Sequence, residues 1–554
     1  MAPSTVFDHA EANGVDIAAR ATVKQAELNG TAERPPVADD YMYDFKYNHA
    51  LPTTDVLGVQ IPQDCDAQAE AEGIVRQLSD ALGTGNAEAF ADLFLEYGVW
   101  RDKLSFTWDQ RTFNFRPAIL KAARDLLPTT KASNFAFLTP APVVDRPYDD
   151  FAQLQFVVSF ETDLVVASAV IKAVLTKEGW KIYTMHTVAE QLKQFPERAP
   201  ADGHMTGTIS WEAQRAKEVD AADPEILIIG GGQNGLALAA WCKALGLNCL
   251  IVERSEEVGD VWKKRYEYLS LHFPHWADDL PFFRYPKQWP TYTPAQKQGF
   301  YMSWYASALE LNIWTKSTVI ETAQDDQGAW AVKINKGGNE SRTVRPKHVL
   351  QGRRDPPLLR ADPSEHDRLF FSTPVGPGEE LGRRAAKVLE DLDRPLLDAL
   401  NARGLRTWRG QRGTGNGTLG QTRNGGFYFD AGACEHIING KIKVEPGYIE
   451  RFTEDKVVLS GGRGREFDLV VFATGFSNLN DSIRDTLGPK VANQVGQVWG
   501  VDEEGEYRGA FRETGVKNLW IMVGFLPMTR FQSRILALRL KALTEGISPP
   551  PYKA

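Results

Sequence analysis

The chain has 554 residues, which is too long for one hydrophobic core and predicts about two to four domains. Hydrophobic residues make up 43% of the chain and charged residues 24%, the composition of an ordinary globular protein. The formal net charge of -9, together with the lack of a basic run interleaved with aromatic residues, argues against a nucleic-acid binder.

The sequence predicts no membrane, secretory or metal-binding segment. No window reaches the roughly 18 consecutive apolar residues of a membrane span, and the N-terminus lacks a basic region followed by an apolar one. We therefore expect a cytoplasmic protein without a membrane partner. The four cysteines are scattered without a Cys-x-x-Cys or Cys/His cluster, so we expect neither disulfides nor a metal site.

Residues 1–65 are predicted to form an N-terminal arm. A possible helix over residues 4–28 is followed by a polar stretch that contains prolines and has no clear periodicity. Aromatic residues alternate along this stretch at Tyr41, Tyr43, Phe45 and Tyr47, which favours docking of the arm on the body of the chain or on a neighbouring subunit. A disordered tail is the alternative.

Residues 66–200 carry the pattern of a separate α+β domain. The spacing of apolar residues over 67–102 predicts helices that are interrupted at 83–86, and residues 116–127 predict a third helix. The period then changes to that of strands, which are separated by short polar or glycine turns. The predicted strands span residues 135–140, 151–162, 164–176 and 180–192.

Two phrases of this domain, AFADLFLEYGVWRD and LTKEGWKIYTMH, resemble the nuclear-transport-factor-2-like (NTF2-like, or SnoaL-like) domains. The resemblance implies an α+β cone that can hold a ligand or catalyse isomerisation. Candidate pocket residues are Asp102, Trp108, Asp109, Arg111 and His186. The interpretation that we prefer is a structural and dimerising module whose cavity is filled.

Residues 224–253 carry the strongest chemical signal of the sequence. The apolar stretch at 226–229 predicts a buried strand, Gly230-x-Gly232-x-x-Gly235 then opens a helix, and a second strand ends in Glu253. The glycines allow a tight turn, close approach of a pyrophosphate and close packing of the helix on the sheet. The helix N-terminus presents free N–H groups to phosphates.

Glu253 lies 23 positions beyond Gly230, where a carboxylate can accept hydrogen bonds from a ribose hydroxyl. Only Arg254 is basic nearby, so a 2'-phosphate is disfavoured, which leaves FAD or NAD. The pattern predicts an α/β, Rossmann-type domain over residues 201–350. Its expected nucleotide contacts are Gly230, Gly232, Gln233, Asn234, Gly235, Glu253 and Arg254.

The stretch SEEVGDVWKKRYEYLSLHFP, which follows, resembles the class B flavin-containing monooxygenases and their plant YUCCA relatives. FDLVVFATGFSNL resembles the family strand that closes over the flavin, and NLWIMVGFLPMTRFQSRILALRLKAL resembles its last strand and helix. The resemblance covers roughly residues 224–546 and implies FAD as the cofactor. It adds these FAD contacts: Gly259, Asp260, Trp262, Arg265, Leu271, His272, Thr474 and Gly475.

The strand predicted around PKHVLQ differs from the family pattern. In the family it ends in Ala-Thr-Gly and leads into an inserted NADPH-binding domain with a second glycine fingerprint. The 117 positions between Leu350 and Asp468 contain no apolar strand followed by such a fingerprint, so we expect residues 351–440 to replace that domain. Residues 441–554 would complete the FAD domain, and binding of NADPH is doubtful.

These patterns predict an FAD-dependent oxidoreductase, a monooxygenase or an oxidase, acting on a small to medium organic substrate such as a secondary metabolite, with O2 as a possible partner. The alternatives are an FAD scaffold for a non-redox isomerisation, cyclisation or dehydration, and a chain without activity. The resemblance places His272 near the flavin face, and Arg265 could neutralise an anion. A histidine that caps a loop is the other interpretation. A homodimer through the NTF2-like domain or the arm is possible.

Overall fold

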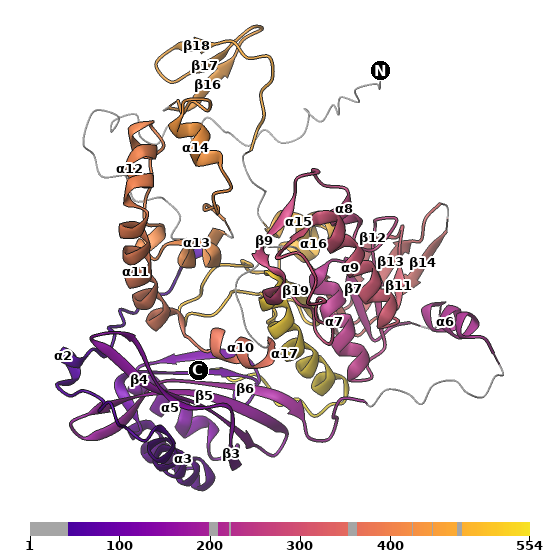
Figure 1. Ribbon diagram of the computed structural model, residues 1–554. Helices are drawn as coiled ribbons and strands as arrows, with labels where there is room; N and C mark the ends of the chain where they lie inside the picture. The colour runs from indigo at the N-terminus through magenta and orange to yellow at the C-terminus, as the bar shows by residue number, and fades with distance from the viewer. Residues whose placement is uncertain are drawn as a thin grey trace. The chain divides into compact units, whose positions relative to one another are not determined.

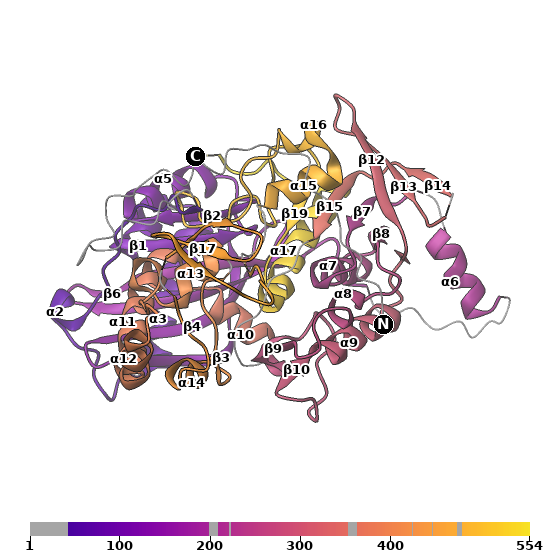
Figure 2. The same ribbon diagram turned by 90° about the horizontal axis from the view of Figure 1, so that it is seen from above.

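The computed structural model describes residues 42–198, 209–220, 223–338, 340–352, 363–423, 425–445, 447–473 and 479–553 (Figures 1 and 2). The helix predicted over residues 4–28 lies outside these ranges. Contacts divide the chain into two units, residues 1–42 and 43–554. None of the described helices combines the length and the apolar character needed to span a membrane.

The described part of the arm docks on the body of the chain, as the alternation of aromatic residues predicts. Tyr43 and Phe45 are buried together with Val501. Tyr43 donates a hydrogen bond to the Glu379 carboxylate of α11 (Val375–Leu392), and Asp44 pairs with Arg508 at 2.6 Å. Residues 43–65 therefore belong to the second unit.

The first sheet of this unit has six strands in the order β2-β1-β6-β5-β4-β3. β1 and β6 run parallel, and the other neighbours run antiparallel. Helices α3 (Ala67–Thr84) and α5 (Arg116–Leu126) pack on strands of this sheet. The strands are β1 (Phe94–Lys103), β2 (Gln110–Asn114), β3 (Ser133–Tyr148), β4 (Phe151–Glu161), β5 (Val165–Thr176) and β6 (Gly179–Leu192).

The structure confirms three predicted helices and four predicted strands of this region but corrects the stretch 87–102. Helix α4 (Ala87–Asp92) is short, and Phe94 begins strand β1 in a stretch where the sequence pattern predicted a helix. The apolar residues of this stretch fit both periods. The strand is favoured because β1 pairs with β2 on one side and with β6 on the other. This pairing satisfies the backbone hydrogen bonds of residues that are almost all buried.

The two faces of the six-stranded sheet differ in chemistry. On the inner face, the Trp100 ring packs against Phe90, Phe106 and Phe113 with centroids 5.1 to 5.4 Å apart. The opposite face, which we call the outer face, carries Arg101, Lys103, Gln110, Thr112, Lys172, His186 and Glu190. Helix α17 (Leu526–Thr544) contacts β6 on this outer face.

The second sheet has five parallel strands in the order β11-β8-β7-β15-β19. Helix α7 (Gln233–Ala244) connects β7 to β8 and lies beside α17 (Figures 1 and 2). This is the doubly wound order, which confirms the predicted Rossmann-type α/β fold. The strands are β7 (Ile226–Ile229), β8 (Cys249–Val252), β11 (Ile313–Trp314), β15 (His348–Gly352) and β19 (Leu519–Met522).

A three-stranded antiparallel sheet is inserted between β11 and β15. Its strands are β12 (Thr318–Gln324), β13 (Trp330–Asn335) and β14 (Ser341–Val344). Helix α9 (Ala295–Ala308) and the short strands β9 (Ser270–Pro274) and β10 (Tyr292–Pro294) precede it. Among the described residues, the next strand of the parallel sheet after β15 is β19, and β19 and α17 confirm the predicted last strand and helix.

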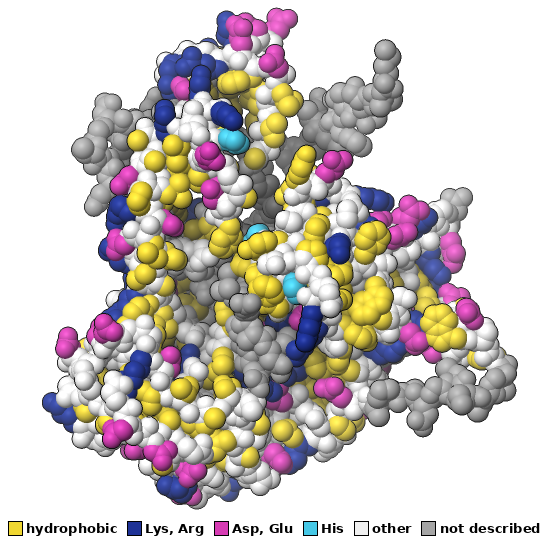
Figure 3. All heavy atoms as spheres, viewed as in Figure 1, with side chains coloured by type: hydrophobic (Ala, Val, Ile, Leu, Met, Phe, Trp, Pro, Cys, Tyr) yellow, Lys and Arg dark blue, Asp and Glu magenta, His cyan; other side chains and the backbone are white. Residues whose placement is uncertain are grey.

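The described residues between β15 and 467 are mainly helical. Their only strands form an antiparallel sheet, β16 (Ile449–Phe452), β17 (Val457–Leu459) and β18 (Arg463–Arg465), and none precedes a glycine fingerprint. Apolar side chains along α11 are exposed in the space-filling view, where charges of both signs are interspersed (Figure 3). The helices are α10 (Pro363–Phe370), α11, α12 (Arg394–Ala402), α13 (Asn416–Arg423) and α14 (Ala433–Ile438).

The prediction of a strand in FDLVVFATGFSNL is wrong for the described residues of this stretch. Residues 468–473 form no strand, and Leu469, Val471 and Phe472 are 78%, 75% and 63% exposed. An apolar run of this kind becomes a strand only beside another strand, and none of the described strands pairs with it. Thr474 and Gly475 lie outside the described residues.

Candidate functional site

The glycine loop between β7 and α7 has the three features that nucleotide binding needs. Gly230 adopts a φ of +103°, which only glycine adopts readily. A Cβ on Gly235 would lie 2.1 Å from the Gly230 carbonyl oxygen, so close packing excludes any side chain there. A Cβ on Gly232 would meet no atom of the described residues within 4 Å, so these residues leave room for a phosphate at the N-terminus of α7.

Glu253, at the end of β8, lies against this loop. Its Oε2 accepts a hydrogen bond from the Gly231 N–H at 2.7 Å, and its Oε1 accepts one from the Ser255 N–H at 2.7 Å. Glu253 is 9% exposed, while Arg254 is exposed. An open cradle with a carboxylate beside it fits the phosphates and ribose of an adenine dinucleotide.

Gln233 and Asn234, which we expected to contact the nucleotide, connect α7 to the C-terminal part of the chain. Gln233 Nε2 donates to the Gly524 carbonyl oxygen at 3.2 Å, and Asn234 Oδ1 accepts a hydrogen bond from Thr529 Oγ1 at 2.6 Å. Both side chains are 1% exposed. They therefore position the first turn of α17 beside the glycine loop.

The turn Gly259-Asp260-Val261-Trp262 is held against α9. A Cβ on Gly259 would lie 2.2 Å from the Gly299 carbonyl oxygen, and its φ is +90°. Asp260 Oδ2 accepts a hydrogen bond from the Glu257 N–H at 3.2 Å, and Trp262 is buried. Leu271 of β9 is also buried. This packing explains the local sequence, and contact of the turn with a flavin stays a prediction.

The two catalytic candidates are both exposed. The Arg265 guanidinium lies 5.8 Å from the centroid of the neighbouring Tyr266 ring. The His272 ring lies 4.6 Å from Phe273 and 5.6 Å from Phe429, and partial desolvation lowers the pKa of His272. Phe429 comes from the segment predicted to replace the NADPH domain, so this segment reaches β9.

Sequence reasoning missed a buried polar centre around Arg530 of α17. Its guanidinium donates to both Asp367 carboxylate oxygens at 2.7 Å, to the Ala277 carbonyl at 3.0 Å and to the Asp279 carbonyl at 2.7 Å. Burial raises the pKa of Asp279 to about 6 and that of Asp278 well above its usual range. No local pattern could reveal this centre, because its residues are far apart in the chain.

The polar candidates of the six-stranded sheet do not converge on a ligand pocket. Asp102 accepts hydrogen bonds from the Thr107 N–H at 2.9 Å and from Thr187 Oγ1 at 2.5 Å. Asp109 pairs with Arg512 at 3.3 Å. Trp108 is buried, and His186 lies on the outer face. Asp102 and Asp109 are thus satisfied by neighbouring groups, whereas neither ring nitrogen of His186 has a hydrogen-bond partner among the described residues.

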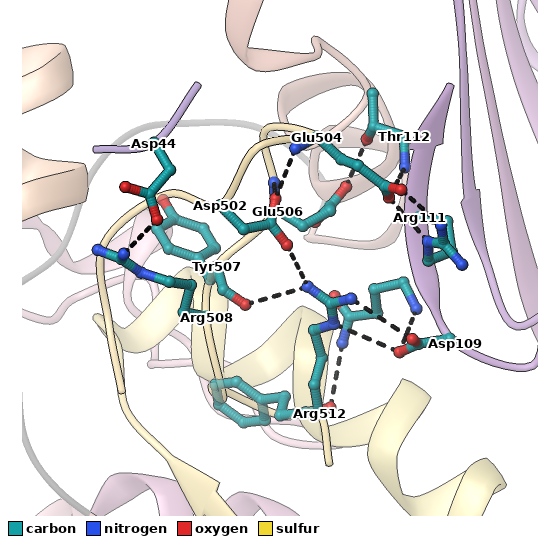
Figure 4. Close-up of polar contacts among 12 residues, drawn as sticks. Asp44, Asp109, Arg111, Thr112, Asp502, Glu504, Glu506, Tyr507, Arg508 and Arg512 are labelled. Atoms are coloured by element: carbon teal, nitrogen blue, oxygen red, sulfur yellow. Dashed lines mark hydrogen bonds and ion pairs between the residues drawn. The ribbon is translucent and has the colours of Figure 1, made fainter. Parts of the chain in front are cut away.

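The loop over residues 502–512 supplies the partners of this sheet (Figure 4). Arg111 pairs with Glu504 at 2.5 Å. Glu506, which is fully buried, accepts hydrogen bonds from Arg101 at 2.5 and 2.8 Å, from Lys103 at 3.2 Å and from Thr112 at 2.8 Å. Burial alone would raise the pKa of Glu506, but the two cations hold it well below its usual range.

Comparison of the sequence with known proteins finds similar monooxygenases, although no family model matches. The rice protein "Indole-3-pyruvate monooxygenase YUCCA1" is 26% identical over 324 residues, which cover 47% of this chain and 79% of the relative. The Arabidopsis protein "Probable indole-3-pyruvate monooxygenase YUCCA4" is 34% identical over 116 residues, covering 21% and 28%. The chain is therefore similar to YUCCA-type monooxygenases over part of its length.

Other similar proteins match shorter or more distant parts. The "Uncharacterized oxidoreductase CzcO-like" of Geobacillus kaustophilus is 31% identical over 113 residues, which cover 20% of this chain and 32% of that protein. Among solved structures, the flavin-containing monooxygenase from Stenotrophomonas maltophilia is 16% identical with a TM-score of 0.38, covering 58% of this chain and all of that one.

Proposed function

We propose that the chain is an FAD-dependent oxidoreductase of the flavin-containing-monooxygenase type that acts on a small to medium organic substrate with O2. The observation that carries the proposal is the open cradle at Gly232 beside the Glu253 carboxylate. The similarity to YUCCA-type monooxygenases selects FAD over NAD. Bound FAD would supply the electron transfer between an organic molecule and O2.

In this proposal each element of the site has one role. The N–H groups at the start of α7 hold the pyrophosphate, and Glu253 accepts the ribose hydroxyls. The first turn of α17, which the hydrogen bond between Asn234 and Thr529 fixes beside the glycine loop, would present its N-terminal dipole to the flavin and favour negative charge there. His272 and Arg265 are the proposed polar groups near the reacting face.

We also propose that the chain lacks a dedicated NADPH domain. Two observations support this. The described residues between β15 and 467 contain helices and one small antiparallel sheet instead of a second parallel sheet. The match to the rice relative extends over 324 residues, whereas 47% of 554 residues is about 260, so part of the relative has no counterpart here. NADPH would then have no dedicated fold to orient its nicotinamide.

The six-stranded domain is proposed to be NTF2-like and structural. Its inner face is filled with aromatic side chains, and the loop over residues 502–512 pairs with its polar groups. A homodimer through the outer face is not part of the proposal, because α17 covers that face.

The test is a flavin spectrum of the purified protein, followed by anaerobic addition of NADPH. We expect a yellow protein with bound FAD that NADPH reduces slowly and without saturation. A colourless protein that FAD cannot reconstitute would contradict the cofactor assignment. Fast, saturable reduction by NADPH would contradict the missing domain.

A further inference from the structure

The outer face of the six-stranded sheet holds two buried polar side chains that docking of the rest of the chain leaves unexplained. Lys172 lies on β5 and His186 on β6. His186 is the register partner of Val170, and Lys172 is the partner of Thr184. The two side chains therefore stand on the same face of neighbouring strands, two positions apart, at the spacing of a diagonal pair.

His186 is 1% exposed, and neither of its ring nitrogens has a hydrogen-bond partner in the described part of the chain. Burial, and then the charges of Arg101 and Lys103, hold the pKa of His186 well below its usual range. A neutral imidazole carries one N–H donor and one acceptor. Leaving both buried and unused is costly, which indicates a partner other than the described side chains.

Lys172 is a buried cation without a paired carboxylate among the described residues. Its ammonium group donates one hydrogen bond, to Thr373 Oγ1 at 2.9 Å. Burial lowers the pKa of Lys172 to about 8, and the nearby Asp145, which raises it, accepts a hydrogen bond from Gln153 at 3.0 Å. Most of the population is still charged at neutral pH, and such a charge is unfavourable unless an anion pairs with it.

Other cations on or against this face are paired. Glu506 neutralises Arg101 and Lys103, as described above. Farther along β6, Glu190 pairs with Arg368 at 2.8 Å and with Arg534. Lys172 therefore stands out as a lysine whose charge the described chain does not balance with an ion pair.

An apolar wall flanks the two groups. The Phe531 ring of α17 lies 6.2 Å from the His186 ring, and Phe371 is stacked on Phe531 with centroids 4.8 Å apart and an interplanar angle of 14°. Phe371 belongs to the same short connection between α10 and α11 that carries Thr373. A ligand that displaced the Thr373 hydroxyl from Lys172 would therefore meet aromatic surface.

We propose that Lys172 and His186 bind the carboxylate of a small organic acid whose apolar part lies against Phe371 and Phe531. The ammonium group and the imidazole N–H donate to the carboxylate, and the ligand takes the place of the Thr373 hydroxyl. This binding site goes beyond the proposed function and does not depend on flavin chemistry.

The test is calorimetric titration of the full-length protein with benzoate, a simple aromatic carboxylate, and with benzamide, its neutral counterpart. The variants are Lys172→Met, Thr373→Val and, as a matched control, Lys193→Met. Lys193 is a half-exposed lysine that already pairs with Glu161 at 2.8 Å. A flavin spectrum of each sample separates this test from that of the proposed function.

We expect one benzoate per chain and no binding of benzamide. Lys172→Met should weaken benzoate binding on the order of tenfold or more, since a hydrogen bond to a charged group is lost. Thr373→Val should strengthen binding because the competing hydroxyl is gone, and Lys193→Met should leave it unchanged. If Lys172→Met does not fold, the affinity of Thr373→Val for benzoate and the binding of benzamide by wild type still test the proposed carboxylate site.

Four results would overturn the proposal. They are the absence of benzoate binding, equal binding of benzamide, unchanged affinity in Lys172→Met, and weaker or unchanged affinity in Thr373→Val. In each of these cases Lys172 would be a buried lysine that serves only to hold Thr373.

Discussion

The two sheets of the chain use their polar residues in opposite ways. Next to the parallel sheet, a Cβ on Gly232 would meet no described atom within 4 Å, and the Glu253 carboxylate is held in place by two backbone N–H groups. On the six-stranded sheet, Arg101 and Arg111 are paired with the loop over residues 502–512. Polar residues thus indicate a ligand-binding site only where the surrounding backbone leaves space for a ligand.

Removal of the buried negative charge that holds the loop to the sheet should have the largest effect. Glu506→Gln leaves Arg101 and Lys103 buried without a counter-charge, which should lower the free energy of unfolding by about 3 to 5 kcal/mol. Urea denaturation measures this. The matched control is Glu504→Gln, whose partly exposed pair with Arg111 should contribute about 1 kcal/mol or less. Equal losses in the two variants would contradict this distinction.

Asp279 contrasts with Glu506, because burial raises the pKa of Asp279 from 3.8 to about 6. Between these values the unfolded chain loses the proton and the folded chain keeps it, so this group lowers the free energy of unfolding as the pH rises. Asp279→Asn removes this titrating group. Between pH 4 and 7 the free energy of unfolding of the variant should therefore rise, relative to that of wild type, by up to about 3 kcal/mol. Denaturation curves over that range measure the gain, and parallel curves would disprove the pKa shift.

Gly235→Ala tests the close packing of α7 on the loop. Its new methyl group would lie 2.1 Å from the Gly230 carbonyl oxygen, so the helix must shift. We expect a loss of about 1 to 3 kcal/mol in the free energy of unfolding, together with weaker binding of FAD. Thermal unfolding with and without FAD measures both, and a variant as stable as wild type would show that the loop can adjust.

Gly73→Ala should have the smallest effect and the opposite sign. Gly73 lies inside α3, and its Cβ would meet only the end of the Arg76 side chain at 3.8 Å. The helix should gain about 0.5 to 1 kcal/mol, because glycine is the less favourable helix residue. Thermal unfolding measures this gain. Destabilisation would mean that the glycine has a role in packing.

Local patterns predicted much of the fold and the local geometry of the glycine loop between β7 and α7. The strand, glycine fingerprint, helix and Glu253 lie within one short stretch of sequence, so the predicted geometry matches the structure. Strand β1 was missed because its partners β2 and β6 decide its conformation. The strand predicted at 468–473 does not form, because none of the described strands pairs with these residues. The pairing of Glu506 with Arg101 joins residues 405 positions apart, which no local pattern reveals.

Binding of FAD by wild type and by Gly232→Val tests the account most directly. The Cβ of the new side chain would meet no described atom within 4 Å, so the variant should unfold at about the same denaturant concentration as wild type. It should have lost FAD binding in a fluorescence titration, because the valine fills the place of the pyrophosphate. Unchanged FAD affinity in a folded Gly232→Val protein would contradict the account.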